Sequence, residues 1–546
     1  MWHGGRIVAN ALKREDVECL FTLCGGHIQS IYDGCIDEDI EVIDVRHEQT
    51  AAHAADGYAR ATGKCGVCAV TAGPGTTDAV TGVANAFRAG VPMVVLGGAG
   101  PDIFRHMGSL QDMDHVELME PITKWAARVT ETRRLPEYLA IAFRKAMTGV
   151  PGPVFLEIPL DTLMDMKDPD DLDWYENYRT EAAVPGDPEY IDRAAELVAD
   201  AEKPMAIVGS QLRWSKRPGV MDRFVEEFSI PTFVNGMARG SIDPDSEYFM
   251  NRARTPSLKR SDCVLVFGTP FDFRLKYGQP PKFNPDAKVV QIDVDPEEIG
   301  RNRDVDVGIV GDTSLVMEGL MESVEERGGL RDLEEWWETV RDLEDQKWEP
   351  MREQMTSDDE PINPLRLCAE VNKFLKDDTV VIGDGGDFVA TAAYTLEVSG
   401  LGNWMDPGPL GTLGVGPGYA MAAKLCNPDS DVVIMYGDGS FGFNGMEFDS
   451  MVRQGLDVVG IIGNDACWTQ IKRGQAQMFG EERCVATDLD FTRYDEVVEG
   501  LGGHGEYVES LDELEGALER AFATDKPALV NVRIGKSDFR KGAISV

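Results

Sequence analysis

The sequence lacks a long apolar run and is poor in basic residues. No stretch of about 18 apolar residues is present, and the start, MWHGGRIVANALKRED, lacks the apolar core of a secretory signal peptide. We therefore expect a cytoplasmic protein that does not cross a membrane. The 546 residues include 95 acidic and only 53 basic ones, which gives a net charge of −42. Such a surface repels nucleic acid and anionic lipid, so neither is an expected partner.

The acidic residues are spread along the whole chain and are not gathered in one tail, as ESVEERGGLRDLEEWWE, TSDDEP and SLDELEGALE show. Two explanations remain: an acidic binding face, or a halophilic acidic surface adapted to a salt-rich cytosol. The even spread favours the second explanation. It carries no information about the chemistry.

The ten cysteines form no disulfide or zinc pattern. Cys65 and Cys68 have CxxC spacing, but no second pair and no histidine cluster accompanies them. They lie in CGVCAVTAG, an apolar segment that indicates a buried strand. We interpret them as reduced strand cysteines.

Apolar strands alternate with helical segments in three blocks, which we place at residues 1–165, 187–330 and 362–546. This alternation predicts an α/β protein with three doubly wound parallel sheets. A polar segment rich in Asp and Pro separates the first two blocks. The acidic stretch LRDLEEWWETVRDLEDQKWEP precedes the third, and we expect it to be a solvated connecting helix.

The third block contains MYGDGSFGFNG, in which an apolar strand ends in a glycine-rich turn. Gly437 and Gly439 flank Asp438 and allow the backbone to approach a ligand closely. Ser440 is a candidate start for the following helix, whose free N–H groups favour a phosphate.

A second strand ends in Gly463-Asn464-Asp465, so Asn464 follows Asp438 by 26 residues. Asp438 and Asn464 provide oxygen ligands at two strand ends, of the type that Mg²⁺ prefers when it also binds phosphate. The carbonyl of Ala466 is the candidate third metal ligand. Two unrelated turns are the alternative, which the paired strand ends make less plausible.

The first block has its own candidate carboxylate. In IDVRHEQTAAHAADGYAR, Glu48 lies where a strand enters an alanine-rich helix that is too apolar to be solvated. A lone glutamate at a helix start is usually only a favourable dipole partner.

GDGS followed by GND resembles the diphosphate-binding signature of the thiamine diphosphate enzymes, and RHEQ…ADGYAR is similar to their catalytic glutamate motif. The first Asn of the family signature is replaced by Gly463, whereas Asn464 matches the metal ligand. The resemblance spans the whole chain and implies pyrimidine-binding, central and diphosphate-binding domains with thiamine diphosphate and Mg²⁺ as cofactors. It implies that Glu48 bonds N1′ of the aminopyrimidine and promotes the tautomer whose imine removes the thiazolium C2 proton.

The same resemblance implies further cofactor contacts. The turn Gly73-Pro74-Gly75 corresponds to the one over the pyrimidine ring, and Leu413 to the residue that wedges between the two rings. Gly411 would offer its carbonyl to N4′. The cofactor-binding residues implied are Gly73, Pro74, Gly75, Gly385, Gly386, Asp387, Gly411, Leu413, Gly437, Gly439, Ser440 and Asn464.

Two residues are candidates for the substrate side. His27, in GGHI, matches the active-site histidine of benzaldehyde lyase, although a helix-capping surface histidine is the alternative. Gln111, in GSLQDMDH, matches a glutamine common to carboligases of this group. Either could relay a proton to a carbinol oxygen, and His106 and His115 have weaker claims.

The resemblance is strongest to the acetolactate-synthase-like branch that includes 2-hydroxyacyl-CoA lyases. The chemistry implied is cleavage or formation of a C–C bond beside a carbonyl of a 2-hydroxyacyl or 2-oxo acid substrate. CWTQIKRGQAQMFGEERC differs from the loop of true acetolactate synthases, and AIVGSQLRWSKRP lacks a convincing glycine-rich turn, which leaves FAD doubtful. Both departures favour a 2-hydroxyacyl-CoA lyase over an acetolactate synthase large subunit, and a catalytically inert cofactor-binding homologue is the third alternative.

The family's active sites lie between two chains. The resemblance therefore implies that this chain is its own partner, in a homodimer or homotetramer. The last residues are net basic (Lys536, Arg540 and Lys541 against Asp538) and are either a contact for an anionic substrate such as CoA or an ordinary surface tail.

Overall fold

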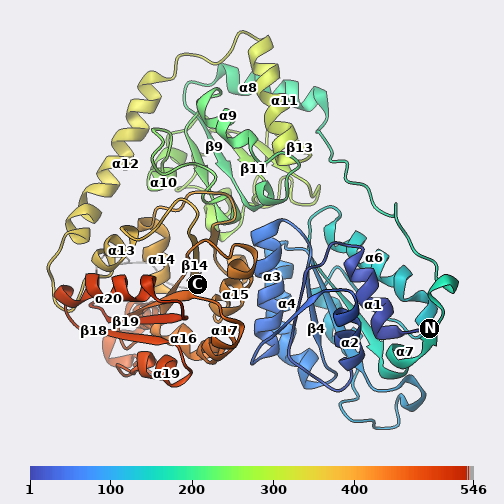
Figure 1. Ribbon diagram of the computed structural model, residues 1–546. Coiled ribbons are helices and arrows are strands. Elements are labelled where there is room, and N and C mark those ends of the chain that lie inside the picture. Colours follow the sequence, from blue (N-terminus) through green and yellow to red (C-terminus); the bar gives the residue numbers. More distant parts are fainter. Residues whose placement is uncertain (538, 540–546) are drawn as a thin grey trace.

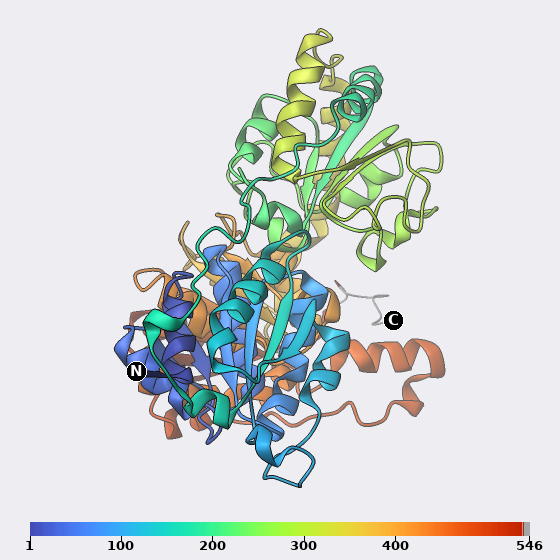
Figure 2. The same cartoon turned by 90° about the vertical axis from the view of Figure 1, so that its right-hand side faces the viewer.

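The computed structural model describes residues 1–537 and 539, and it contains three parallel sheets flanked by helices (Figure 1). The central sheet lies apart from the other two, which are side by side in one view and overlap in the other (Figure 2). The predicted fold class is therefore confirmed.

The first sheet has the strand order β3-β2-β4-β5-β7-β6, with every pair parallel. Its strands are β2 (Cys19–Thr22), β3 (Glu41–Asp44), β4 (Gly66–Val70), β5 (Met93–Ala99), β6 (Trp125–Arg128) and β7 (Pro153–Pro159). A separate antiparallel pair joins β1 (Trp2–His3) and β8 (Met166–Lys167). The helices are α1 (Gly4–Lys13), α2 (Gln29–Asp37), α3 (Glu48–Thr62), α4 (Pro74–Ala89), α5 (His115–Met119), α6 (Leu135–Met147) and α7 (Leu160–Met164).

Both faces of this sheet are covered, because alternate residues of one strand enter two different cores. On β5, Val95 packs into a cluster that includes residues of α3 and α4, whereas Val94 and Leu96 pack into one that includes residues of α1 and α6. Strands buried on both faces read as unbroken apolar runs, which is why these strands could be predicted from the sequence.

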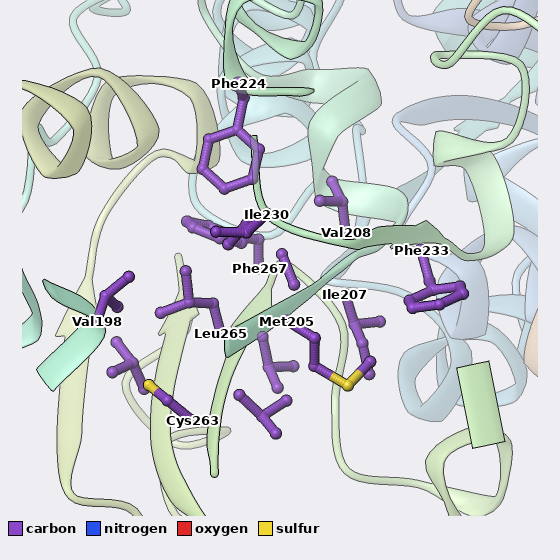
Figure 3. Close-up of a cluster of buried hydrophobic side chains, with 14 of the residues drawn as sticks. Val198, Met205, Ile207, Val208, Phe224, Ile230, Phe233, Cys263, Leu265 and Phe267 are labelled. Carbon is purple, nitrogen blue, oxygen red and sulfur yellow. The ribbon is translucent and has the colours of Figure 1, made fainter. Parts of the chain in front are cut away.

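The central sheet has the order β10-β9-β11-β12-β13, again all parallel. Its strands are β9 (Pro204–Val208), β10 (Thr232–Val234), β11 (Cys263–Phe267), β12 (Lys288–Asp293) and β13 (Val307–Val310). Its helices are α8 (Pro188–Asp200), α9 (Val220–Glu226), α10 (Arg254–Leu258) and α11 (Thr313–Glu326). Phe224 of α9 lies over Phe267 of β11 with a ring separation of 5.5 Å, within a dense apolar cluster (Figure 3).

The acidic stretch before the third block is the long helix α12 (Glu334–Met355), and it is not simply a solvated connector. Trp336 and Trp337 are buried in the central core, and their indole N–H groups donate to the carbonyls of Pro204 and Ser229. The expectation was wrong for the side of α12 that carries these tryptophans. The segment is highly charged overall, but its apolar residues form one stripe that packs against the core.

The third sheet has the order β15-β14-β16-β17-β19-β18, all parallel. Its strands are β14 (Val380–Asp384), β15 (Trp404–Met405), β16 (Val432–Gly437), β17 (Val458–Asn464), β18 (His504–Val508) and β19 (Ala528–Arg533). Its helices are α13 (Pro364–Asn372), α14 (Asp387–Thr395), α15 (Gly416–Cys426), α16 (Asp438–Asn444), α17 (Phe448–Gln454), α18 (Thr469–Phe479), α19 (Tyr494–Gly500) and α20 (Leu511–Ala523). The first and third sheets thus have the same strand order when each is numbered from its own first strand.

Helices α3 and α15 join these two sheets through a buried polar network. Asp56 of α3 accepts hydrogen bonds from Arg60 (2.6 Å), from Asn85 (3.0 Å) and from the Tyr419 hydroxyl of α15 (2.8 Å). All four side chains are buried, and a buried hydrogen-bonded network of this kind favours one geometry. This contact fixes the position of the first sheet, whose helix α3 begins at Glu48, relative to the third sheet, which carries the glycine-rich turns.

Two expectations concern what the chain does not contain. Within residues 1–537 and 539, no helix is long and apolar enough to cross a membrane. The cysteines are all free thiols, and Cys65 and Cys68 are buried at β4 as expected.

Candidate active site

The turn after β16 brings together the expected metal residues. Gly437 caps α16, which begins at Asp438, so the helix starts two residues earlier than Ser440. The expectation for Ser440 as the helix start was therefore wrong. Its hydroxyl donates to the carbonyls of Asp384 and Gly437, and this bonding ties the turns after β14 and β16 together.

Asp438 is a buried carboxylate without a cationic partner among the described residues. Its oxygens accept the N–H groups of Gly439 (2.9 Å) and Cys467 (3.1 Å). Burial, and then the nearby charge of Asp465, raise the pKa of Asp438 to about 7. A carboxylate in this position gains most from a cation beside it.

Asn464 ends the neighbouring strand β17 and is fully buried. Its amide donates to Asn531 (3.1 Å), and its side-chain oxygen accepts the N–H of Ala466 (3.2 Å). Ala466 has a φ of 52°, a left-handed conformation that is uncommon for a residue with a Cβ. This strained backbone lies at the expected third metal ligand, and backbone strain is often found at functional sites.

The departure from the family signature at Gly463 has a structural explanation. A Cβ placed there would lie 2.6 Å from the ring of Phe388, which fills the space on α14. The ring of Phe388 therefore takes up the space that a side chain at position 463 would need. The neighbouring Asn464 keeps its place.

The donor set fits Mg²⁺ rather than a zinc-type centre. The described part of the chain contains no group of three His, Cys, Asp or Glu side chains that could hold a metal. The expected site instead combines one carboxylate, one amide oxygen and one backbone carbonyl, which are hard oxygen donors, and phosphate would supply further oxygens.

A cavity of about 700 Å³ opens at the carboxyl ends of β14, β16 and β17. Of the expected residues, it is lined by Gly385, Gly386, Asp387, Gly411, Leu413, Gly437, Asp438, Gly439 and Ser440. Asn464 and Ala466 lie beside it but are not among its lining residues. Phe273 and Tyr277 of the central block contribute to its wall.

Two charged residues of this cavity were not among the expected site residues. Arg473 of α18 holds the carboxylate of Asp387 through two hydrogen bonds (2.5 and 2.7 Å), so that carboxylate is already paired. Asp465 lines the cavity, and burial raises its pKa. The basic KRG segment after the second motif was the available signal for Arg473.

Asp384 was also missed, although it ends β14 one residue before the expected glycines. It is fully buried and accepts the N–H groups of Gly414 (3.0 Å) and Gly416 (2.8 Å). Burial raises its pKa to about 7. These bonds hold the loop that carries Leu413, whose carbonyl also accepts a hydrogen bond from Gln49 (3.3 Å).

Glu48 begins α3 and is 6% exposed. Burial is the main cause of its raised pKa, and the described residues include no hydrogen-bonding side chain or cation paired with it. A Cβ on Gly75 would lie 3.4 Å from its Oε1, so the Gly73–Gly75 turn lies beside the carboxylate. Glu48 does not line the cavity described above.

The substrate-side candidates lie next to the same turn. His27 is buried, and its Nδ1 lies 3.2 Å from the hydroxyl of Thr71. Burial lowers the pKa of His27, and a hydrogen bond with Gln111 partly opposes that shift. His106 is exposed, whereas His115 is buried behind the turn.

Comparison with known proteins identifies the family of the chain. The descriptions that match are the N-terminal TPP binding domain (residues 2–118), the central domain (191–320) and the C-terminal TPP binding domain (384–532) of the thiamine pyrophosphate enzymes. The chain is 39% identical over 539 residues to the acetolactate synthase large subunit IlvG of Mycobacterium tuberculosis, covering 97% of this chain and 95% of that protein.

Two relatives of a different name are about as similar. The 2-hydroxyacyl-CoA lyase 2 of Danio rerio is 38% identical, with 100% of this chain and 93% of the relative covered. The human protein of that name is 36% identical, with 100% and 92% covered. The chain therefore belongs to the thiamine pyrophosphate (thiamine diphosphate) enzyme family, as a homologue of acetolactate synthase and 2-hydroxyacyl-CoA lyase.

Proposed function

We propose that this enzyme cleaves a 2-hydroxyacyl-CoA between its first two carbons, giving an aldehyde and formyl-CoA, with thiamine diphosphate and Mg²⁺ as cofactors. The observation that carries the choice is the apolar lining of the cavity. Phe273, Tyr277, Leu410 and Ile471 line it and are each 40–53% exposed. Exposed apolar side chains around a cleft suit an extended acyl chain better than the methyl group of pyruvate.

The residues at the strand ends have binding roles in this proposal. Asp438, Asn464 and the carbonyl of Ala466 hold Mg²⁺ against the diphosphate. The glycines at residues 385, 386, 437 and 439 let the backbone approach it, and Leu413 supports the bend between the two rings. When bound, thiamine diphosphate supplies a nucleophilic carbon that adds to the substrate carbonyl and accepts the electron pair of the breaking C–C bond.

Glu48 exchanges a proton with the aminopyrimidine in this scheme. Its burial raises its pKa, so its carboxyl group holds a proton at a higher pH than an exposed glutamate would. The Gly73-Pro74-Gly75 turn and the bond from Gln49 to the Leu413 carbonyl fix the surroundings of this carboxyl.

His27 and Gln111 are assigned to the substrate oxygen. The lowered pKa of His27 favours the uncharged imidazole near neutral pH, which can accept the proton of the 2-hydroxyl group as the C–C bond breaks. Gln111 is placed to hydrogen-bond the same oxygen. The aldehyde then leaves, and protonation completes formyl-CoA.

Acetolactate synthesis is the second candidate, and the identity to IlvG favours it. Against it, the carboxyl end of β9 is closed by Gln211, which donates to Asp293 (2.7 Å) and occupies the space beside Gly268. A filled turn at this point supports a central block without FAD.

A product assay separates the two candidates. The purified protein, with Mg²⁺ and thiamine diphosphate in high salt, receives either a 2-hydroxyacyl-CoA or pyruvate. We expect an aldehyde and formyl-CoA from the first and no acetolactate from the second. Acetolactate as the main product would reverse the order of the candidates.

The site is proposed to be completed by a second copy of the chain. Glu48 is absent from the cavity that contains Asp438. The segment 103–113, which carries Gln111, exposes four apolar side chains by 47–79%: Ile103, Phe104, Met107 and Leu110. We propose that this segment faces the cavity of the partner in a homodimer or homotetramer.

Complementation tests the shared site. Glu48→Gln and Asp438→Asn chains carry different affinity tags, are co-expressed, and are purified over both tags. A site built from two chains leaves one of the two sites in the mixed dimer intact, so about half of the wild-type activity per dimer is expected. An inactive mixed dimer would show that each site lies within one chain.

Asp538, Arg540 and Lys541 lie outside the described residues, and Lys536 lines the cavity.

A further inference from the structure

A buried chain of hydrogen bonds lies behind the turn that flanks Glu48. His115, the first residue of α5, accepts the Gly73 N–H through Nε2 (2.7 Å), and its Nδ1 lies 2.6 Å from Oε1 of Glu157. A backbone N–H can only donate, so Nε2 carries no proton and Nδ1–H donates to the carboxylate. His115 and Glu157 are 1% and 2% exposed.

The other end of this chain fixes the tautomer of His115. Glu157 lies on β7, and its Oε2 accepts a hydrogen bond from Arg128 of β6 (2.6 Å). Arg128 also donates to Asp102 (2.9 and 3.1 Å). With one oxygen engaged by a guanidinium, the carboxylate presents its other oxygen to the imidazole as an acceptor, which keeps the proton on Nδ1.

The turn also has bonds within its own segment, from the Thr76 hydroxyl to the Thr71 carbonyl (3.1 Å) and from the Thr77 N–H to the Gly73 carbonyl (3.0 Å), whereas the Gly73 N–H is anchored from outside the segment by His115. Gly73 has a φ of 62° and caps α4 without a side-chain hydrogen bond. A Cβ at Gly73 would lie 2.8 Å from the Cβ of Gln111, and one at Gly75 would lie 3.4 Å from Oε1 of Glu48. The turn therefore separates the proposed substrate residue from the proposed catalytic carboxylate, and a shift of its backbone moves one relative to the other.

We propose that His115 is a positioning residue. It anchors the Gly73 amide so that the turn keeps Glu48 and Gln111 in register with the cofactor and substrate, and Glu157 and Arg128 set the tautomer that this requires. The inference rests on the proposed role of Glu48 for its consequence in catalysis. The anchoring of the Gly73 amide by His115 does not depend on that role and can be tested separately from it.

The first measurement needs no cofactor. Amide hydrogen exchange of the segment 71–77 is compared in cofactor-free wild type, His115→Leu and His115→Gln. Leucine removes the acceptor, so the Gly73 amide should exchange at least about tenfold faster in that variant. Glutamine can accept from Gly73 through Oε1 and donate to Glu157 through Nε2, so it should restore most of the protection.

The second measurement follows the exchange of the thiazolium C2 proton in D₂O, with thiamine diphosphate and Mg²⁺ bound and no substrate present. We expect a rate about 10–100-fold lower in His115→Leu, the size of effect typical of residues that orient a functional group. Glu157→Gln should give a smaller loss, because one amide oxygen cannot accept from both Arg128 and His115. That variant also serves if the leucine variant does not fold.

Unchanged exchange at Gly73 in His115→Leu would overturn the anchoring. Faster exchange at Gly73 with a wild-type rate at the thiazolium C2 would reduce His115 to a merely structural residue, and so would also overturn the proposal. If Glu48→Gln retains the wild-type C2 rate, the proposed role of Glu48 fails, whatever the Gly73 amide shows.

Discussion

Glu48→Gln is expected to lower turnover by at least about 100-fold while thiamine diphosphate still binds, since loss of a positioned acid or base typically costs 10²- to 10⁴-fold. The amide keeps the shape of the side chain but cannot exchange a proton with the aminopyrimidine. The carboxylate is buried, which raises its pKa. Turnover and cofactor affinity are measured on the same preparation.

Glu41→Gln provides the matched control. Glu41 lies on β3, the strand that precedes α3, but its side chain is exposed. This variant should have wild-type turnover. Full activity in Glu48→Gln, with the cofactor bound, would contradict the mechanism.

Asp438→Asn is expected to weaken binding of Mg²⁺ and thiamine diphosphate by at least about 100-fold, because a first ligand should matter at least as much as the groups that orient ligands. The variant loses the charge that faces the metal and keeps most of the volume of the side chain. Trp468 lines the same cavity, so its fluorescence can report cofactor titrations in both proteins.

The same substitution should have the opposite effect on the cofactor-free protein. The pKa of Asp438 is about 7 in the folded state and about 3.9 in an unfolded chain. The folded state therefore binds more protons between these values, and its free energy of unfolding falls as the pH rises from about 4 to about 7. Asp438→Asn removes this penalty.

We therefore expect cofactor-free Asp438→Asn to be more stable than wild type at pH 8 and to converge with it near pH 4. Denaturant unfolding at both pH values measures the difference. Asp429→Asn, at an exposed position before β16, should change neither value. If wild type were more stable than Asp438→Asn at pH 8 without cofactor or Mg²⁺, the Asp438 carboxylate would not be an unpaired buried charge that destabilises the folded protein.

The sequence predicted the interiors of the sheets better than their edges. The buried strands β4, β5, β9, β11, β16 and β17 stand out as apolar runs. The strands β6, β13, β15 and β18 were not predicted from the sequence, and each of them is an edge strand of its sheet. WAAR and HGEYV contain polar residues because an edge strand is partly solvated, and that mixture gives a weak signal.

A similar limit applies to the site. Asp438, Asn464 and Glu48 occur in recognisable motifs, so their positions were predictable, and their roles remain proposals. Asp384, Arg473 and His115 act through partners that are 30, 86 and 42 residues away in the chain. Only the fold brings such pairs together, and a single sequence carries no trace of the distance between them.

The identical strand order of the first and third sheets allows their helices and turns to be compared position by position. Helix α3 follows the second strand of the first sheet, and α15 follows the second strand of the third sheet. The two helices pack against one another. Glu48 begins α3, and the Leu413 loop directly precedes α15. The Gly73 turn follows the third strand of the first sheet, and Asp438 follows the third strand of the third sheet. The proposed acid and the proposed anion-binding turn therefore lie on two scaffolds of the same topology within one chain.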